Sequence, residues 1–592
     1  MKRFNFITNI VLLILVGIGT TSCEDFLTLY PQDRIVEEKF WEDKNDLEGV
    51  RNEVYRNMAS TIEKLIIWGD IRSDAYVINP SYNSQQGNNQ TYTKIVEAQL
   101  DTTMTQYDWG SVYTTINYCN KILNKGAEVL ARDAQFTATE WQQMRAEITA
   151  MRALNYFYLL RAFKDIPFTM QVINSDEEVQ NFVATNQLAV LDYLISDVTA
   201  VAGLGKNRFS QTVESRGYMT NTAIYALLAD MYLWRSALRE GRGFPEEEFK
   251  ADAQKVIEFG QKSLDALALQ NQQINNSSFD RSTRKTDDFG SGLPNAPLIK
   301  NEDMQNDYNA KLSVTINSYS SIFISGNSDE SMFELQFLES DQRKNGVVGS
   351  LWGNSAGTHF AASKDALTNA LGDKYDSDSR IWYSCQNQVN NETSDLTGYY
   401  MFKWSNCRFN FGNQEGKFKT TYSSDDYHNW IIYRMTDVML MMAEAHAVLG
   451  NYAECRNIVD AIHKRSMLDQ STGLSVATSD KTKDKCIDLV MKERLIELIG
   501  EGKRWFDLVR YAERKGGGHN PDPREPQYMD GSDGVNAMVS TFLAKTYTSM
   551  EAPLKNRIKN RYGLYSPIYY MEIRANNGLM QQNPVWNREK AL

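Results

Sequence analysis

Proline, cysteine and histidine are scarce in this sequence of 592 residues, which holds 12, six and five of them. Because no Pro-rich or Ser-rich linker divides the chain, we expect one large domain, or two tightly interleaved lobes, although the length would allow several domains. No pair of cysteines has C-x-x-C spacing, and neither an H-E-x-x-H motif nor a glycine-rich phosphate loop occurs. Zinc, redox and nucleotide motifs are therefore lacking.

Excess positive charge is lacking as well. The net charge is −12, and no basic stripe runs along the chain. A nucleic-acid partner is therefore not expected, because neutralisation of phosphates supplies most of the affinity of such proteins. The acidic balance is equally unsuited to an anionic lipid surface, so contact with a membrane would need a separate anchor.

Long apolar runs are missing except at the start. Lys2 and Arg3 precede a nearly apolar run over 7–18, which is shorter than the ~20 residues that cross a bilayer as a helix. We interpret residues 1–22 as a signal peptide that is removed. Small residues precede Cys23, and the segment resembles a lipoprotein signal, which implies that Cys23 becomes the acylated first residue. An ordinary secretory signal followed by an incidental cysteine is the alternative.

Apolar residues recur at three- and four-residue steps along much of the chain, which predicts helices. Trp109, Trp141, Trp430 and Trp505 lie within these patterns and are assigned to the core. The turn at Gly450, with small alanines before it, favours a helical hairpin of the tetratricopeptide type. The expected helices cover 36–66, 109–122, 139–163, 188–201, 219–238, 249–269, 430–449, 452–466 and 483–511.

The middle of the chain, 270–426, lacks this periodicity and is rich in Gly, Asn and Ser. It is too long for one loop, so we interpret it as an irregular lobe in which 331–337 alternates like a short strand. The predicted fold is mostly α, a tetratricopeptide-like helical-repeat (α-solenoid) scaffold with a large loop-rich lobe and few short strands. Within a single domain over 23–592, the scaffold covers about 33–269 and 427–515, and a C-terminal segment covers 516–592.

Three further features of the sequence could indicate a catalytic serine, a calcium site or a disulfide. Residues 353–357 match G-x-S-x-G, yet no α/β alternation places Ser355 on a hydrolase turn, so a secreted serine hydrolase is a weak alternative. Calcium could bind a group of aspartates, although a solvated turn before Arg380 is favoured. That group is Asp373, Asp376 and Asp378. Cys385 and Cys407 could form a disulfide, whereas Cys119, Cys455 and Cys486 lie in helical patterns and are expected to be buried.

Glu493, Glu497 and Glu501 recur every four residues and share one face of a predicted helix, with Arg494 and Arg504 nearby. Carboxylates can serve acid–base catalysis, but a glycosidase needs two of them across a sugar cleft, about 5–9 Å apart. We favour a structural ion-pair network beside Trp505 over a catalytic site.

Five motifs follow one another along nearly the whole chain after residue 22. They are C-E-D-F-L at 23–27, W-x-x-x-Y-x-x-I-x-x-x-N at 109–120, R-x-x-D-x-x-L-x-x-A-E-A at 434–445, E-R-x-x-E-L-x-x-E-G-x-R-W-x-D-L at 493–508 and Q-N-P at 582–584. In this order and number they resemble the SusD/RagB family.

The resemblance implies a cell-surface lipoprotein of the outer membrane, anchored only by its lipid, that catalyses nothing and needs no cofactor. Such a protein binds an oligosaccharide and delivers it to a partner, a SusC-like TonB-dependent outer-membrane transporter. Peptide cargo, as in some members of the family, is the alternative. A helical-repeat scaffold without any small ligand is less favoured.

Aromatic residues in polar stretches are the candidate ligand contacts. The apolar C–H face of a sugar ring stacks on Trp or Tyr, while its hydroxyls need polar partners. The resemblance implies that the loop after the first helix contributes to the site, with an acid near Asp74. The candidates are Asp74, Tyr76, Tyr82, Tyr92 and Trp352. We expect two or three of them to touch ligand, and expect that replacing Tyr82 or Trp352 with alanine lowers affinity without unfolding the protein.

Overall fold

The computed structural model describes residues 40–79, 89–179, 182–210, 213–274, 286–300, 320–337, 344–352, 358–372, 378–386, 398–401, 403–404, 407–411, 418–422, 427–467, 482–516, 538–543, 561–576 and 579–586. Helices dominate these residues and the strands are short, so the predicted mostly helical fold is confirmed. Within the described ranges, no helix combines the length and the apolar character needed to cross a membrane.

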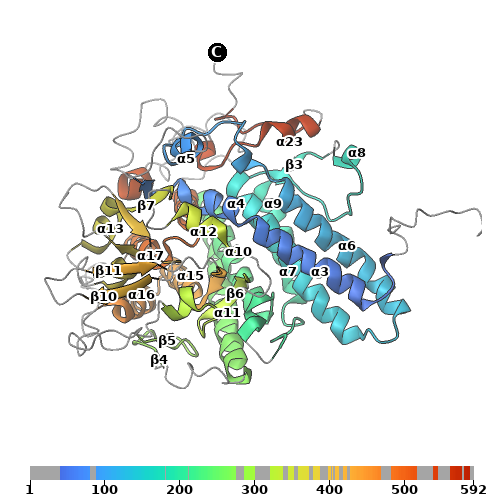
Figure 1. Ribbon diagram of the computed structural model, residues 1–592, viewed down its shortest axis with the longest axis horizontal. Coiled ribbons are helices and arrows are strands. Elements are labelled where there is room, and N and C mark those ends of the chain that lie inside the picture. The colour runs from blue at the N-terminus through green and yellow to red at the C-terminus, as the bar shows by residue number, and fades with distance from the viewer. Residues whose placement is uncertain are drawn as a thin grey trace, which may run out of the picture.

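The first half of the scaffold is a stack of long helices (Figure 1). Helix α3 (Lys44–Ser60) packs on α6 (Gly110–Arg132), which packs on α7 (Ala138–Phe163). A capping box starts α7, because the Thr137 hydroxyl accepts from the Glu140 N–H at 3.2 Å and the Glu140 carboxylate accepts from the Thr137 N–H at 2.9 Å. Helices α9 (Gln187–Val201) and α10 (Asn221–Gly241) extend the stack.

The second half continues this stack after the lobe. Helix α11 (Glu246–Gln273) packs on both α10 and α15 (Met435–Leu449). Gly450 ends α15 with a φ of 86°, in the left-handed region that glycine adopts without strain, and α16 (Tyr452–Ser466) folds back from it. This confirms the predicted helical hairpin. Helices α17 (Lys483–Leu498) and α18 (Arg504–Arg514) complete the scaffold.

Several predicted elements differ from the structure. The helix predicted over 36–66 begins only at Lys44 and is interrupted at Thr61, after which α4 (Ile62–Ile66) follows. Residues 430–434 are not helical but form β12 (Trp430–Arg434), because they pair with β6 (Ser331–Leu335) from the lobe. The helix predicted over 483–511 is two helices, since Gly500 and Gly502 have φ values of 80° and 72° between them. The polar stretch after residue 79 contains a helix, α5 (Asn89–Val96).

A small antiparallel sheet ties the lobe to the N-terminal part of the chain. Its strand order is β1 (Tyr76–Ile78), β7 (Phe360–Ser363), β9 (Gly398–Met401) and β8 (Cys385–Gln386). Tyr76 is opposite Ala362 in the register. The predicted short strand over 331–337 is confirmed as β6, although all five of its residues are buried rather than alternating. The lobe therefore shares strands with both halves of the scaffold.

The remaining elements are short and connect these parts. They are α4 (Ile62–Ile66), η2 (Ile67–Ile71), η3 (Thr105–Tyr107), β2 (Ile166–Pro167), α8 (Asp176–Val179), β3 (Ala184–Thr185), η4 (Val213–Gly217), β4 (Thr286–Asp287), β5 (Leu298–Ile299), η6 (Ser320–Ile324), α12 (Gly346–Leu351), α13 (Lys364–Leu371), α14 (Ser379–Ser384), β10 (Cys407–Phe411), β11 (Phe418–Tyr422), η9 (Val539–Leu543), η10 (Arg561–Leu564) and α23 (Tyr570–Ala575).

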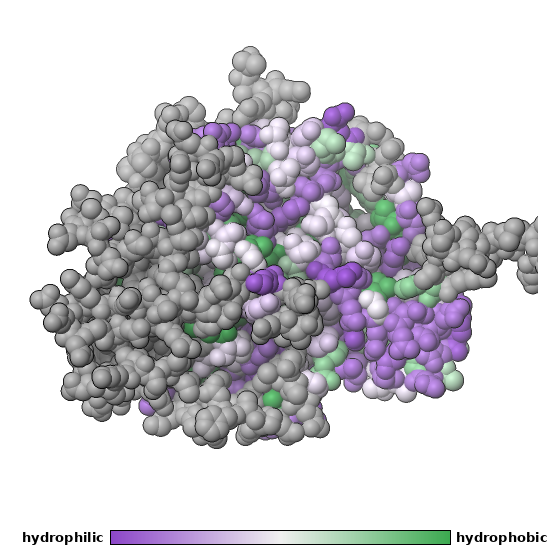
Figure 2. Space-filling model, viewed as in Figure 1, coloured by the Kyte–Doolittle hydropathy of each residue, from purple (hydrophilic) through white to green (hydrophobic). Residues whose placement is uncertain are grey.

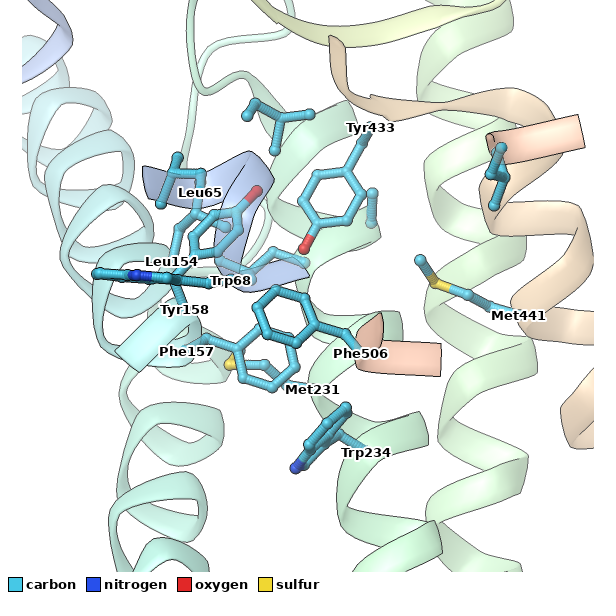
Figure 3. Close-up of a cluster of buried hydrophobic side chains, with 14 of the residues drawn as sticks. Leu65, Trp68, Leu154, Phe157, Tyr158, Met231, Trp234, Tyr433, Met441 and Phe506 are labelled. Carbon is cyan, nitrogen blue, oxygen red and sulfur yellow. The ribbon is translucent and has the colours of Figure 1, made fainter. Parts of the chain in front are cut away.

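The apolar core lies where helices from both halves meet. In Figure 3, Trp68 of η2, Phe157 of α7, Trp234 of α10 and Phe506 of α18 belong to one cluster, and all four are buried. Each such side chain contributes about 1.5–3 kcal/mol relative to exposure. The Arg161 guanidinium lies 4.2 Å from the Phe157 ring centre and 4.5 Å from that of Phe506, so cation–π contacts help to hold this buried charge.

A row of alternating buried charges, the charge ladder, fixes α18 against α10, α15 and α17. Each of its inner carboxylates lies between two cations. In spatial order its members are Lys503, Asp437, Arg494, Asp507, Arg510, Glu444, Arg514 and Glu240. Burial opposes ionisation of Glu444, but Arg510 and Arg514 outweigh it and hold the pKa of this carboxyl at about 2.

Figure 2 shows one face of the molecule. Where its residues are described, this face is mainly hydrophilic, with hydrophilic residues gathered over the ends of α3, α6 and α7. Seven large apolar side chains are exposed among the described residues as a whole. They are Val183, Tyr193, Leu204, Leu269, Tyr570, Met571 and Leu579.

Candidate binding site

Rings from separate segments of the chain form one continuous group, the aromatic row. The Trp352 ring stacks on those of Tyr76 and Trp430, with centroid distances of 6.1 and 6.4 Å, and Trp404 stacks on Trp430 at 5.1 Å. At the other end, Phe360 of β7 joins Tyr76 to Tyr92 of α5. The members of the row are Phe323, Trp404, Trp430, Trp352, Tyr76, Phe360, Tyr92 and His359.

The buried carboxyl of Asp70 holds the hydroxyl of Tyr76 in place. The Tyr76 hydroxyl donates to Asp70 at 2.6 Å and accepts from the Gly500 N–H at 2.7 Å. The N–H groups of Gly502 and Arg504 also donate to Asp70, at 3.0 and 3.3 Å. Burial raises the pKa of Asp70 to about 7, even though these hydrogen bonds favour its ionised form.

Close backbone contact makes this arrangement possible. A Cβ atom built on Gly69 would lie 2.0 Å from the carbonyl oxygen of Gly502. Only glycine at position 69 therefore lets η2 approach the turn over 499–503 this closely. The same turn accepts a hydrogen bond of 2.8 Å from the Trp404 indole N–H to the Gly500 carbonyl, so it touches the row at two points.

The structure brings three of the five predicted contact residues together. Tyr76, Trp352 and Tyr92 belong to the aromatic row, with exposed fractions of 1%, 2% and 7%. Asp74 is not a member of the row, and Arg504 binds both of its oxygens at 2.7 and 2.8 Å. Tyr82 lies outside the described residues. Their role as ligand contacts stays a prediction.

Burial changes one expectation. Trp352 is almost wholly enclosed, and its indole N–H has no hydrogen-bond partner within the described part of the chain. Removing a buried Trp side chain leaves a cavity and costs about 3–5 kcal/mol. We therefore expect Trp352→Ala to destabilise the protein, in contrast to the expectation from the sequence alone.

The outer end of the row is polar and only partly buried. The Tyr92 hydroxyl donates to Glu63, and the Tyr92 and His359 rings lie 4.4 Å apart. Glu63 and His359 are half-buried. Partial burial lowers the pKa of His359, and the nearby Glu63 acts in the opposite direction. We call Glu63, Tyr92 and His359 the polar edge.

Sequence reasoning missed Glu63, His359 and Trp404. Trp404 offered the same signal as Trp352, an aromatic residue in the polar middle of the chain. Glu63 looked like an ordinary polar position of a predicted helix, and His359 lay beyond the G-x-S-x-G stretch. Neither carried a local signal, because 267 residues separate His359 from its ring partner Tyr92 in the chain.

Glu493, Glu497 and Glu501 form a buried ion-pair network, as predicted, which we call the carboxylate network. Glu497 binds three arginines and Glu501 binds Arg434 and Lys403. These pairs have N–O distances of 2.5–2.9 Å and join Glu493 and Glu497 to Arg380, Glu497 to Arg434 and Arg465, and Glu501 to Arg434 and Lys403. Arg494 and Arg504 were expected nearby, but they bind other carboxylates.

Electrostatics show that these carboxylates are structural. Burial disfavours ionisation of Glu497, but Arg465, Arg434 and Arg380 hold its pKa well below its usual range. Burial lowers the pKa of Lys403 to about 8, although Glu501 favours its charged form. Acid–base catalysis needs a carboxyl that can exchange a proton near neutral pH, and a carboxylate shared by three arginines does not offer one.

The other chemical alternatives receive no support from the described residues. Ser355 lies outside them, as do Asp373 and Asp376. Asp378 is buried and binds Arg380 at 2.7 Å, so the expected solvated turn is wrong at this position. No three His, Cys, Asp or Glu residues gather as a metal site in the described ranges.

The cysteines are described in part. Cys119, Cys455 and Cys486 are buried, as predicted. The side chains of Cys385 and Cys407 lie outside the described part of the structure, so the possible disulfide stays a prediction.

Two family models match the chain. The one described as "SusD family" matches residues 271–586, and the one described as "Starch-binding associating with outer membrane" matches residues 25–233. SusD-like protein P38 of Formosa agariphila is 24% identical over 534 residues, covering 86% of this chain and 92% of that protein. SusD-like protein P25 of the same organism is 22% identical over 529 residues, covering 86% and 90%.

Solved structures show the same fold. A SusD homolog from Bacteroides thetaiotaomicron has a TM-score of 0.62 at 18% identity, covering 92% of this chain and 99% of its own. NanU of B. fragilis has a TM-score of 0.58 at 18% identity, covering 94% and 100%. A laminarin-binding SusD-like protein has a TM-score of 0.57 at 17% identity, covering 92% and 99%. At these identities the likeness concerns the fold alone.

Proposed function

This chain belongs to the SusD family, and from that premise we propose that it is a cell-surface glycan-binding protein that catalyses no reaction. It captures oligosaccharides and delivers them to a TonB-dependent outer-membrane transporter of the SusC type. A lipid on Cys23 anchors it to the outer membrane after removal of residues 1–22. Residues 23–592 act as one domain, in which the helical scaffold supports the lobe.

The observation that carries this proposal is the aromatic row with its polar edge. Sugars need an apolar platform and polar partners within the same few ångströms, since one face of the ring is C–H and the rim is hydroxyl. His359 supplies a half-buried ring that the Tyr92 ring supports at 4.4 Å, and Glu63 supplies an acceptor beside them. We assign the polar edge to the glycan site, and Tyr82 stays a candidate contact from the sequence alone.

Tyr76 and Trp352 lie behind this edge in the row. Their stacking at 6.1 Å and their burial suit a supporting role, in which they hold Phe360 and hence Tyr92 in place. Asp74 supports the site indirectly. Its ion pair with Arg504 fixes the start of α18 beside Asp70. The laminarin-binding relative is consistent with a glycan as cargo.

Absence of catalysis is part of the proposal. A glycosidase requires two carboxyls across the scissile bond, one of them free to carry a proton. Glu493 and Glu497 are bound to arginines within the scaffold, and Glu63 is the single carboxylate of the polar edge. When the protein is incubated with a glycan that it binds, the glycan should therefore not be cut and no new reducing ends should appear.

The test is calorimetry of the chain from Glu24 onward with a panel of plant and host oligosaccharides and a peptide digest. We expect saturable binding to one glycan class with a Kd of about micromolar or weaker, because cargo must be released and an open platform buries little area. Heat from peptides alone would move the protein to a peptide-binding role. Silence with both would overturn the proposal in favour of a ligand-free scaffold.

Point variants locate the site. His359→Ala removes a half-buried ring from the polar edge and should weaken binding about two- to tenfold, since stacking against a ring is worth about 0.5–1.5 kcal/mol. Tyr193→Ala is the matched control, because that ring is 46% exposed on α9, far along the chain from the row. Equal affinities in both variants would remove the site assignment and leave the family membership intact.

A further inference from the structure

The last described part of the chain, the C-terminal strap (561–576 and 579–586), returns to the N-terminal helices. The Ser566 N–H donates to the Ala162 carbonyl at 2.8 Å, and the Tyr570 N–H donates to the Thr102 carbonyl at 2.9 Å. The Asn576 side chain donates to the Phe182 carbonyl at 2.6 Å. In Figure 1 the helix of this strap, α23, lies at the top of the molecule near β3 and α8.

Two carboxyl groups meet where α23 reaches the start of α6. Glu572 of α23 lies beside Asp108, the residue two positions before α6 begins. A Cβ atom built on Gly110 would lie 3.2 Å from Asp108 Oδ1 and 3.6 Å from Glu572 Oε1, so both carboxyls border the same small space. Two ionised carboxylates so close to each other repel, whereas a protonated one can donate a hydrogen bond to the other.

Few charges compensate this pair. Lys64 of α4 binds Asp108 at 3.2 Å, and the Gly110 N–H donates to Asp108 at 2.8 Å. Glu572 also has a hydrogen bond with the Trp109 side chain. Tyr113 on α6, whose hydroxyl donates to the Pro167 carbonyl at 2.7 Å, and Tyr569 before α23 interact with the pair through their charges only when ionised. The pKa values of both are raised, so both are neutral near pH 7. One lysine therefore faces two carboxyls.

We propose that Glu572 and Asp108 form a pH-operated latch, which holds α23 on the start of α6 while the two carboxyls share a proton and loosens when both are ionised. The latch controls a surface element, because Tyr570 and Met571 of α23 are 38% and 46% exposed. Its opening changes the apolar surface that the protein presents to its surroundings. Nothing in this inference depends on the glycan site.

The direction of the effect follows from proton linkage. Partial burial, together with Asp108, raises the pKa of Glu572 from 4.5 to about 7. The closed strap thus binds a proton more tightly than the open one. Docking of α23 is strongest at pH values below about 4.5, weakens as the pH rises through about 7, and then levels off.

The test is hydrogen–deuterium exchange of the purified full chain between pH 5.5 and 8.5, with rates corrected for intrinsic exchange. We expect the protection of the amides in Tyr570–Ala575 to fall about tenfold across this range. Glu572→Gln keeps a neutral hydrogen-bonding group, and its protection should stay constant with pH. The matched control is Glu247→Gln at the exposed start of α11, which should behave like the unmodified chain.

A second variant distinguishes a latch from a contact that is merely structural. Lys64 favours the ionised form of Glu572, so Lys64→Gln should move the midpoint of the change in protection to higher pH. A pH profile that is flat in the unmodified chain would overturn the proposal. An unchanged profile in Glu572→Gln would do the same, as would a midpoint that Lys64→Gln leaves in place or lowers.

Discussion

The carboxylate network and the aromatic row are both buried, and both touch the turn over 499–503, yet different forces hold them. Glu501 of this turn binds Arg434 and Lys403, whereas Gly500 binds Tyr76 and Trp404 through its backbone. In the network every charge depends on a specific partner, and losing one leaves its neighbour buried and unpaired. In the row, stacking is spread over many rings.

Because of this difference, we expect the carboxylate network to be rigid and the aromatic row to be more adaptable. A network of buried ion pairs tolerates no change of position, which suits a scaffold that must present a lobe in one orientation. Stacked rings keep most of their energy through small shifts, and the row ends at the half-buried polar edge. The comparison predicts that variants in the network lower stability, whereas variants at the end of the row lower affinity.

The largest effect should come from breaking the network. Arg434→Met removes a partner that Glu497 and Glu501 share. We expect the free energy of unfolding to fall by about 3–5 kcal/mol, because each of these two buried carboxylates loses one of its cations. Denaturant unfolding measures this loss. Lys250→Met, which breaks an exposed pair with Glu246, is the control and should leave the unfolding midpoint where it was. Similar midpoints in the two variants would refute the comparison.

A somewhat smaller effect is expected where the two regions meet. Gly69→Ala places a methyl group 2.0 Å from the Gly502 carbonyl, so η2 and the turn must separate at a cost of about 1–3 kcal/mol. Gly49→Ala in α3 is the matched control, since a methyl group there meets nothing within 4 Å. It should stabilise the helix by about 0.5–1 kcal/mol. Thermal unfolding would show opposite signs for the two variants.

The pH dependence of stability sharpens the comparison further. The pKa of Asp70 is about 7 in the folded protein and 3.8 as a free group, so the folded state binds the extra proton between these values. Stability attributable to Asp70 is therefore lost as the pH rises from about 4 through 7. Asp70→Asn cannot titrate, and its free energy of unfolding should change less between pH 5 and 8. Parallel pH profiles for the two proteins would contradict this assignment.

The smallest effect on stability should accompany a clear effect on binding. Tyr92→Phe removes only the hydroxyl that donates to Glu63, at a cost of about 1 kcal/mol or less to folding. We expect weaker glycan binding, measured by calorimetry, because Glu63 loses its fixed position. Tyr225→Phe on α10 serves as the control for loss of a tyrosine hydroxyl elsewhere. An unchanged affinity of Tyr92→Phe would contradict the assignment of the polar edge to the glycan site.

Local patterns predicted the long helices well. The expected helix over 452–466 and the helical hairpin at Gly450 match the structure, because periodicity and a left-handed glycine are properties of a few neighbouring residues. The carboxylates of the network were recognised for the same reason. Their partners were not, since Arg380 and Lys403 come from the lobe and approach α17 only through the tertiary fold.

The candidate site was predictable only in part. Tyr76, Tyr92 and Trp352 were selected as aromatic residues in polar stretches, and the fold does bring them together. Their burial was not foreseeable, because it depends on which segments cover them. The strand at 430–434 was misread as helix for a related reason, as its pairing partner lies about 100 residues away in the chain.

The sequence by itself determined the helical scaffold and the family, because periodicity, turn residues and motif order depend on residues close together in the chain. The tertiary structure alone decided which charges pair, which rings stack and which of them reach the surface. Asp74 illustrates the reason. In the sequence it is an acidic residue in a polar stretch. In the structure Arg504, 430 positions away, neutralises its charge inside the scaffold. Contacts between distant segments set the environment of a side chain, and the environment sets what that side chain can do.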